Sequence, residues 1–200
     1  LNVDNAMRWG FAWKMGPFEA WDAIGVKGSA AKMKQAGYEI PGWVQEMLGS
    51  GKESFYKREG GALSFYDIPS KDYKPVPVKP GVILLPSLKE RKKLIVGNKG
   101  ASLVDIGDGV ACLEFHSKMN ALGDDIISMI SKSADIVSKD FLGLVIANHG
   151  ENFSVGANLA LVLFAAQEEE WDDLEWGIKV FQDSLMKLKY LDKPVVAAPA

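Results

Sequence analysis

An apolar run that leads through a glycine-containing loop into a second apolar run constrains the fold of this chain most. Residues 143–163 read GLVIANHGENFSVGANLALVL, and this order predicts a buried strand, a loop and the start of a helix. Backbone N–H groups in the first turn of a helix have no partner within the helix and lie at the positive end of its dipole. The segment therefore predicts a site that stabilises negative charge on a nearby oxygen.

The neighbouring segments alternate between strand and helix patterns. Residues 101–115 predict a hairpin with Gly107, Asp108 and Gly109 in its turn. Two helices are predicted, at residues 124–137 and 171–190. Their expected apolar stripes are Ile127, Ile130, Ala134 and Val137 in the first and Leu174, Ile178, Phe181, Leu185 and Leu188 in the second. With a last strand starting at Pro194, these segments predict an α/β fold whose parallel strands have right-handed connections.

The first half of the chain has a different character. Residues 5–26 predict two short helices that meet at Gly16-Pro17, and residues 26–35 and 43–48 predict two more. Residues 54–68 predict a hairpin around Gly60-Gly61. The proline-rich residues 69–86 predict an extended linker, followed by a short polar helix near residues 87–93.

Composition excludes several classes of protein. The chain has 200 residues, of which 48% are hydrophobic and 24% charged, with a net charge of -3, as in an ordinary globular protein. The apolar run at residues 159–166 is far shorter than the roughly 20 residues that span a bilayer. No signal segment opens the chain, so we expect no membrane span and a cytoplasmic location. The absence of a basic stripe argues against nucleic acid as a partner.

Other chemistry-bearing residues point mainly to structural roles. Cys112 lies in an apolar strand pattern and is expected to be buried and inert, and no Cys/His spacing suggests a metal site. His116 and His149 could act as bases at neutral pH but show no recognisable partner, which favours structural or surface roles. The acidic residues 168–175, like Asp124 and Asp125, are typical of solvated helix starts.

The motifs EFHSKMNAL, GLVIANHGENFSVGANL and KPVVAAPA make residues 101–200 resemble the first half of the enoyl-CoA hydratase/isomerase (crotonase) family. This resemblance implies a crotonase-like ββα superhelix in which the Ala157 N–H is one of two oxyanion-hole donors for a thioester carbonyl. It implies that Asn120 shapes the loop beneath coenzyme A. The residues implied to border the acyl-CoA are Phe153, Val155, Gly156, Asn158, Leu159 and Ala160. Many relatives have Asp at position 158, but a backbone donor does not depend on that side chain.

Spacing alone favours a structural turn at Ala157, and only the family pattern favours the oxyanion hole. The second donor and the catalytic glutamates of the family follow the strand that here ends at Ala200. Leu1 is not an initiator Met, and the apolar residues 194–200 have no following helix. We therefore expect a piece of a longer protein, inactive by itself and poorly soluble because apolar sheet edges stay unpaired.

The sequence NAMRWGFAWKMGPFEAWDAIG resembles the C-terminal helical domain of 3-hydroxyacyl-CoA dehydrogenases. Gly16, Pro17, Phe18, Asp22 and Gly25 carry this resemblance. It implies that the family's catalytic His-Glu pair and its NAD-binding Rossmann domain lie upstream. No G-x-G-x-x-G occurs in this chain, so we expect that it does not bind NAD itself.

Together, the two resemblances imply a fragment of a bifunctional β-oxidation enzyme that hydrates trans-2-enoyl-CoA and oxidises 3-hydroxyacyl-CoA with NAD. Residues 1–53 would end the dehydrogenase C-terminal helical domain, residues 54–98 would form a hairpin and linker, and residues 99–200 would begin the crotonase domain. The substrate would be an acyl-CoA, and the parent enzyme would form a homo-oligomer. Two alternatives remain open: another crotonase chemistry, such as isomerisation or thioester hydrolysis, and a non-catalytic acyl-CoA-binding or assembly module.

Overall fold

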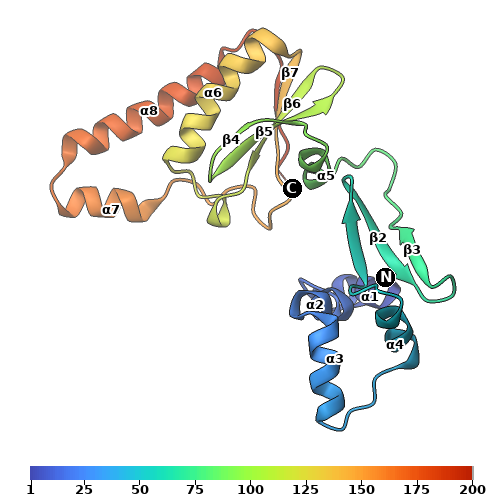
Figure 1. The fold of residues 1–200 in the computed structure, drawn as a ribbon. Coiled ribbons are helices and arrows are strands. Elements are labelled where there is room, and N and C mark those ends of the chain that lie inside the picture. The colour runs from blue at the N-terminus through green and yellow to red at the C-terminus, as the bar shows by residue number, and fades with distance from the viewer. Residues whose placement is uncertain (200) are drawn as a thin grey trace. The chain divides into compact units, whose positions relative to one another are not determined.

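The computed structural model of the protein describes residues 1–199 and divides the chain into two compact units, Leu1–Val82 and Ile83–Ala200 (Figure 1). The first unit joins short helices to a small antiparallel sheet, and the second joins helices to a mixed sheet. The predicted α/β class is therefore confirmed.

Four short helices open the first unit: α1 (Asn2–Phe11), α2 (Pro17–Ile24), α3 (Val26–Gln35) and α4 (Gly42–Gly49). The predicted break at Gly16-Pro17 is confirmed, because Pro17 occupies the first turn of α2, where its missing N–H costs nothing. The Gly16 N–H donates to Glu19 Oε2 at 2.8 Å and completes the start of the helix.

The small sheet has the order β1-β2-β3, with antiparallel strands β1 (Tyr56–Glu59), β2 (Ala62–Asp67) and β3 (Asp72–Pro75). The predicted hairpin around Gly60-Gly61 is confirmed. The expectation that residues 69–86 form only a linker is wrong for β3, which pairs with β2 although it lies in that stretch. An extended proline-rich backbone also suits an edge strand, and Pro75 lies at the strand end, where its missing N–H is tolerated.

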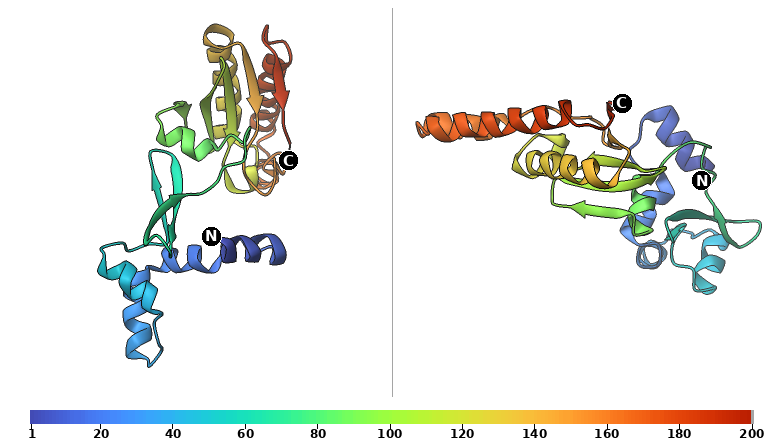
Figure 2. Two further views of the ribbon diagram at one scale, coloured as in Figure 1. Left: turned by 90° about the vertical axis from the view of Figure 1, so that its right-hand side faces the viewer. Right: turned by 90° about the horizontal axis from the view of Figure 1, so that it is seen from above.

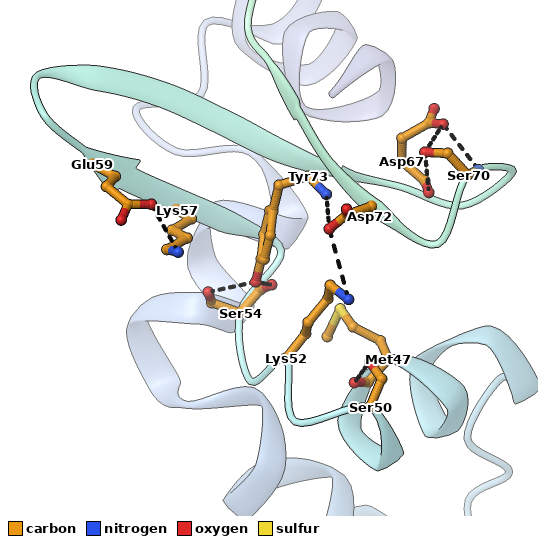
Figure 3. Close-up of polar contacts among 10 residues, drawn as sticks. All are labelled: Met47, Ser50, Lys52, Ser54, Lys57, Glu59, Asp67, Ser70, Asp72 and Tyr73. Atoms are coloured by element: carbon orange, nitrogen blue, oxygen red, sulfur yellow. Dashed lines mark hydrogen bonds and ion pairs between the residues drawn. The ribbon is translucent and has the colours of Figure 1, made fainter.

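Polar contacts join this sheet to the loop that precedes it (Figure 3). The Tyr73 hydroxyl donates to the Ser54 carbonyl at 2.7 Å, and Lys52 lies 3.7 Å from Asp72 in an ion pair. These long-range contacts hold β3 in place, and local sequence patterns do not predict them.

The core of the first unit is rich in aromatic side chains around Phe55. Phe18, Trp21 and Trp43 pack around its ring with centroid distances of 5.0, 5.3 and 5.6 Å. Such tilted and edge-to-face pairs add to the free energy of burial. The buried core residues are Val26, Ala30, Ile40, Val44, Met47, Phe55 and Tyr66.

The second unit is built on a five-stranded sheet of order β4-β5-β6-β7-β8. Its elements are α5 (Leu85–Glu90), β4 (Leu94–Gly97), β5 (Ala101–Gly107), β6 (Val110–Phe115), the 3₁₀ turn η1 (Lys118–Asn120), α6 (Asp124–Asp140), β7 (Gly143–Ile146), α7 (Leu159–Gln167), α8 (Trp171–Lys189) and β8 (Val195–Ala197). Strands β4, β5 and β6 are antiparallel, and β7 and β8 then continue the sheet parallel to β6. The predicted hairpin and parallel crossovers are confirmed, whereas the edge strand β4 was not foreseen.

Helix α6 covers one face of this sheet, and α8 packs beside α6 (Figures 1 and 2). Ile126 is 1% exposed in this core, whereas the predicted core residue Ile127 is only half-buried. The α8 stripe is also corrected, since Leu188 is buried but Ile178 and Leu185 are 50% and 43% exposed. Helical periodicity defines an apolar face, but burial needs an element to cover it, and the described residues cover only part of this face.

The opposite face of the sheet contacts α5. Cys112 is buried there with Leu85 and Val104, and burial raises the pKa of its thiol to about 11. A thiol with a raised pKa forms little of the reactive thiolate at neutral pH. The expectation that Cys112 is buried is thus confirmed, and the raised pKa agrees with an unreactive thiol.

Candidate functional site

The segment from β7 to α7 has the predicted order of strand, loop and helix. The helix begins directly after Asn158, whose Oδ1 accepts a hydrogen bond from the Ala160 N–H at 3.2 Å. Asn is a good helix cap, because its amide oxygen accepts from the otherwise unpaired N–H groups of the first turn. The neutral side chain at position 158 therefore still starts the helix.

A short stretch of parallel pairing orients the backbone at Ala157. The Leu122 N–H donates to the Gly156 carbonyl at 2.8 Å, and the Asn158 N–H donates to the Leu122 carbonyl at 3.3 Å, which makes a bridge between Leu122 and Ala157. Gly156 has a φ of +85°, a conformation that favours glycine. In the part of the chain that the structure describes, the exposed Ala157 donates no backbone hydrogen bond.

Asn120 holds the loop between β7 and α7 through hydrogen bonds. Its side chain is buried, and its Nδ2 donates to the Asn152 carbonyl at 2.8 Å. Ser154 Oγ donates to the Asn120 carbonyl at 2.7 Å and accepts from the Gly156 N–H at 3.1 Å. Asn120 has a φ of +53°, which Asn tolerates better than most residues. Sequence reasoning selected Asn120 but missed Ser154, whose contacts all depend on the tertiary fold or on the loop conformation.

A cavity of about 540 Å³ opens beside this backbone, and Ala157 and Asn158 form part of its wall. Most of the other lining is apolar and comes from the loop before α6 and from α6, α7 and α8: Leu122, Ile127, Val162, Leu174, Ile178 and Phe181. The carboxylate residues on the wall are Asp124, Glu170 and Asp173. The arrangement can therefore hold an apolar group next to a free backbone N–H.

The remaining predicted site residues do not line this cavity. Phe153 packs against Phe115 with a centroid distance of 6.2 Å. Val155 and Leu159 are 47% and 75% exposed. Gly156 and Ala160 act through their backbone in the loop and in the first turn of α7. The structure thus brings together Asn120, Gly156, Ala157 and Asn158 but leaves the apolar side chains of the loop outside the cavity.

Both histidines line a second cavity of about 470 Å³ at the carboxyl ends of β6 and β7. His116 Nε2 lies 2.8 Å from Ser102 Oγ, a partner on the neighbouring strand that sequence spacing did not reveal. Glu114, another lining residue, is buried and forms an ion pair with Lys89. The contact with Ser102 is consistent with the structural role that the sequence favours for His116.

Among residues 1–199, no group of three or more His, Cys, Asp or Glu side chains is arranged to hold a metal ion. Within that range no helix combines the length and apolar character that a membrane span requires.

Two curated relatives match nearly the whole chain. The chain is 51% identical over 197 residues to a "Probable 3-hydroxyacyl-CoA dehydrogenase" of Bacillus subtilis (strain 168), covering 98% of this chain and 25% of that protein. It is 26% identical over 190 residues to a "Putative fatty acid oxidation complex trifunctional enzyme" of Rickettsia felis, covering 94% of this chain and 23% of that protein. The chain spans about a quarter of the length of these relatives. No protein-family model matches it.

Solved structures with partial likeness include an enoyl-CoA hydratase from Polaromonas sp. JS666, with a TM-score of 0.46 and 20% identity over 50% of this chain and 39% of that one. Another is an enoyl-CoA hydratase/carnithine racemase from Magnetospirillum magneticum. It has a TM-score of 0.44 and 19% identity over 52% of this chain and 39% of that one.

Proposed function

The chain is a relative of bacterial fatty-acid β-oxidation enzymes along nearly its whole length, and we propose that it is one segment of a bifunctional enzyme of this pathway. The complete enzyme would hydrate trans-2-enoyl-CoA and oxidise the 3-hydroxyacyl-CoA product with NAD. This segment would contribute half of the oxyanion hole of the hydratase. By itself it would turn over neither substrate.

The free N–H of Ala157 is the observation that carries this proposal. It lies in the wall of an apolar cavity, at the start of a helix, with no competing acceptor among the described residues. During hydration, negative charge develops on the thioester carbonyl oxygen, and a fixed N–H stabilises that charge more than it stabilises the neutral carbonyl. One such donor is typically worth about 3 kcal/mol of the barrier.

The same proposal assigns each part of the chain to a domain of the enzyme. Residues 1–53 would end the C-terminal helical domain of the dehydrogenase, residues 54–98 would connect the two enzymes, and residues 99–200 would form the N-terminal half of the hydratase domain. The small sheet β1-β2-β3 shares the first unit with the helices, so part of the connecting segment would support that domain.

The ligand of this segment would be the coenzyme A thioester. Asn120 would hold the loop beneath the coenzyme, and Gly156, Ala157 and Asn158 would face the thioester. NAD would bind in an upstream domain and not in this chain. The enzyme would act in the cytoplasm as a homo-oligomer.

Replacing the Ala157 amide by an ester tests the oxyanion role directly. Incorporation of lactic acid at position 157 of the full-length gene product removes the N–H and keeps the side chain. We expect kcat/KM for crotonyl-CoA hydration to fall by about 100-fold. NAD-dependent oxidation of 3-hydroxybutyryl-CoA by the same preparation is the internal control and should not change.

Each alternative predicts a different result. Hydration that is unaffected by the ester would overturn the proposed role of Ala157. A wild-type gene product that binds acyl-CoA but hydrates none would favour the non-catalytic binding module. Conversion of 3-enoyl-CoA, or release of free coenzyme A, in place of hydration would indicate isomerase or thioester hydrolase chemistry.

A further inference from the structure

We propose that Ser154 is a positioning residue that fixes the direction of the Ala157 N–H, an inference that rests on the proposed oxyanion function. Ser154 does not line the cavity beside Ala157, and it precedes Ala157 by three positions. Its effect would act through the backbone between the two residues.

The hydroxyl of Ser154 joins two separate backbone segments. It donates to the Asn120 carbonyl at 2.7 Å, and it accepts from the Gly156 N–H at 3.1 Å. Asn120 is itself buried and donates from Nδ2 to the Asn152 carbonyl at 2.8 Å. The turn that precedes α6 thus holds the loop at Asn152 and at Ser154.

Two consecutive peptide groups are fixed by these contacts. The Val155–Gly156 peptide is held through its N–H by Ser154 Oγ, and the Gly156–Ala157 peptide is held through its carbonyl by the Leu122 N–H at 2.8 Å. In a planar trans peptide the C=O and N–H point in opposite directions. The carbonyl bond to Leu122 therefore directs the Ala157 N–H away from Leu122.

Gly156 makes this arrangement depend on Ser154. Glycine is the residue whose φ and ψ are least restricted by its own side chain, and Gly156 lies between the two fixed peptides with a φ of +85°. Without the bond to Ser154 Oγ, the contacts with Leu122 are the hydrogen bonds among the described residues that would still oppose rotation about Gly156. The Ala157 N–H would then sample a wider range of directions, and a donor contributes most when its direction is fixed before the reaction.

Ser154→Ala removes both hydrogen bonds, and Ser154→Thr retains a hydroxyl on the same carbon. We expect Ser154→Ala to lower kcat for crotonyl-CoA hydration by about 10-fold with little change in KM, because the lost interaction matters mainly in the transition state. Ser154→Thr should restore most of kcat. Ser138→Ala is the matched control and should leave kcat unchanged, because among the described residues Ser138 Oγ bonds only the exposed Asp192 side chain, at 3.1 Å.

Amide hydrogen exchange in the 200-residue chain gives a second readout that needs no turnover. The Gly156 N–H should exchange faster in Ser154→Ala than in the wild type and should regain its protection in Ser154→Thr. Equal protection of Gly156 in all three proteins, or an unchanged kcat in Ser154→Ala, would overturn the positioning role. If Ser154→Ala retains kcat while the Ala157 ester loses it, only this inference fails. If the ester has no effect, the proposed function itself fails.

Discussion

Asp22 accepts a 2.7 Å hydrogen bond through its Oδ1 from the backbone N–H of Phe55, which lies 33 residues further along the chain. Its second oxygen accepts from the Tyr56 N–H at 2.8 Å. One carboxylate on α2 thereby holds the backbone at the start of β1. The Asp of the sequence motif Gly-Pro-Phe…Asp-x-x-Gly thus links the helices of the first unit to its sheet.

Removing this carboxylate should destabilise the first unit. In Asp22→Ala, the Phe55 and Tyr56 N–H groups lose their acceptor, which should lower the free energy of unfolding by roughly 1–3 kcal/mol. Urea denaturation followed by tryptophan fluorescence measures the change. Asp22→Asn keeps one acceptor oxygen and should fall between the wild type and Asp22→Ala; equal stability of all three proteins would contradict the bridging role.

Gly16 should not accept a side chain. A Cβ at this position would lie 2.2 Å from the Cβ of Asp4, a residue that is 1% exposed and accepts hydrogen bonds from the Phe18 N–H and the Tyr56 hydroxyl. Gly16→Ala should therefore cost about 1–3 kcal/mol through overpacking. Gly10→Ala is the matched control, because nothing lies within 4 Å of that position and Ala favours the helix. Thermal unfolding measures the Tm of both variants. A similar Tm for Gly16→Ala and Gly10→Ala would contradict the predicted overpacking at position 16.

Two isoleucines of the second unit, one buried and one exposed, should differ in how much they contribute to stability. Ile126 on α6 is 1% exposed, and Ile178 on α8 is 50% exposed. Ile126→Ala should lower the free energy of unfolding by about 2–5 kcal/mol, because it leaves a cavity in a packed core. Ile178→Ala should cost much less. Chemical denaturation of both variants checks the difference, and a larger loss in Ile178→Ala would show that the α8 stripe is buried in solution.

The turn between β2 and β3 should respond to acid. Lys74 and Ser70 hydrogen-bond to the Asp67 carboxylate and lower its pKa from 3.8 to about 2. A lowered pKa in the folded state means that the stabilisation is present above pH 3.8 and is lost as the pH falls through about 2. The stability difference between wild type and Asp67→Asn should therefore shrink between these pH values. Denaturation at several pH values measures it, and a constant difference would be inconsistent with this account.

Local chemistry in the sequence determined the order of the elements. Pro17 marked the start of α2, Gly60-Gly61 marked the first hairpin, and the run from residue 143 to residue 163 marked a strand, a loop and a helix. These features depend on residues close together in the chain. Turn, cap and periodicity preferences act over such short distances, which is why a single sequence was enough to predict them.

Which segments meet in space depended on the packing of the whole fold. This packing paired β3 with β2, placed Ile126 rather than Ile127 in the core, and put Ser102 beside His116. At the candidate site, the sequence selected Asn120 and Ala157, whereas Ser154 emerged only from its contacts with Asn120 and Gly156. Hydrogen bonds between distant segments depend on how those segments pack. The type and spacing of a residue indicate that it can form a hydrogen bond, but they do not identify the partner that lies beside it in the folded chain.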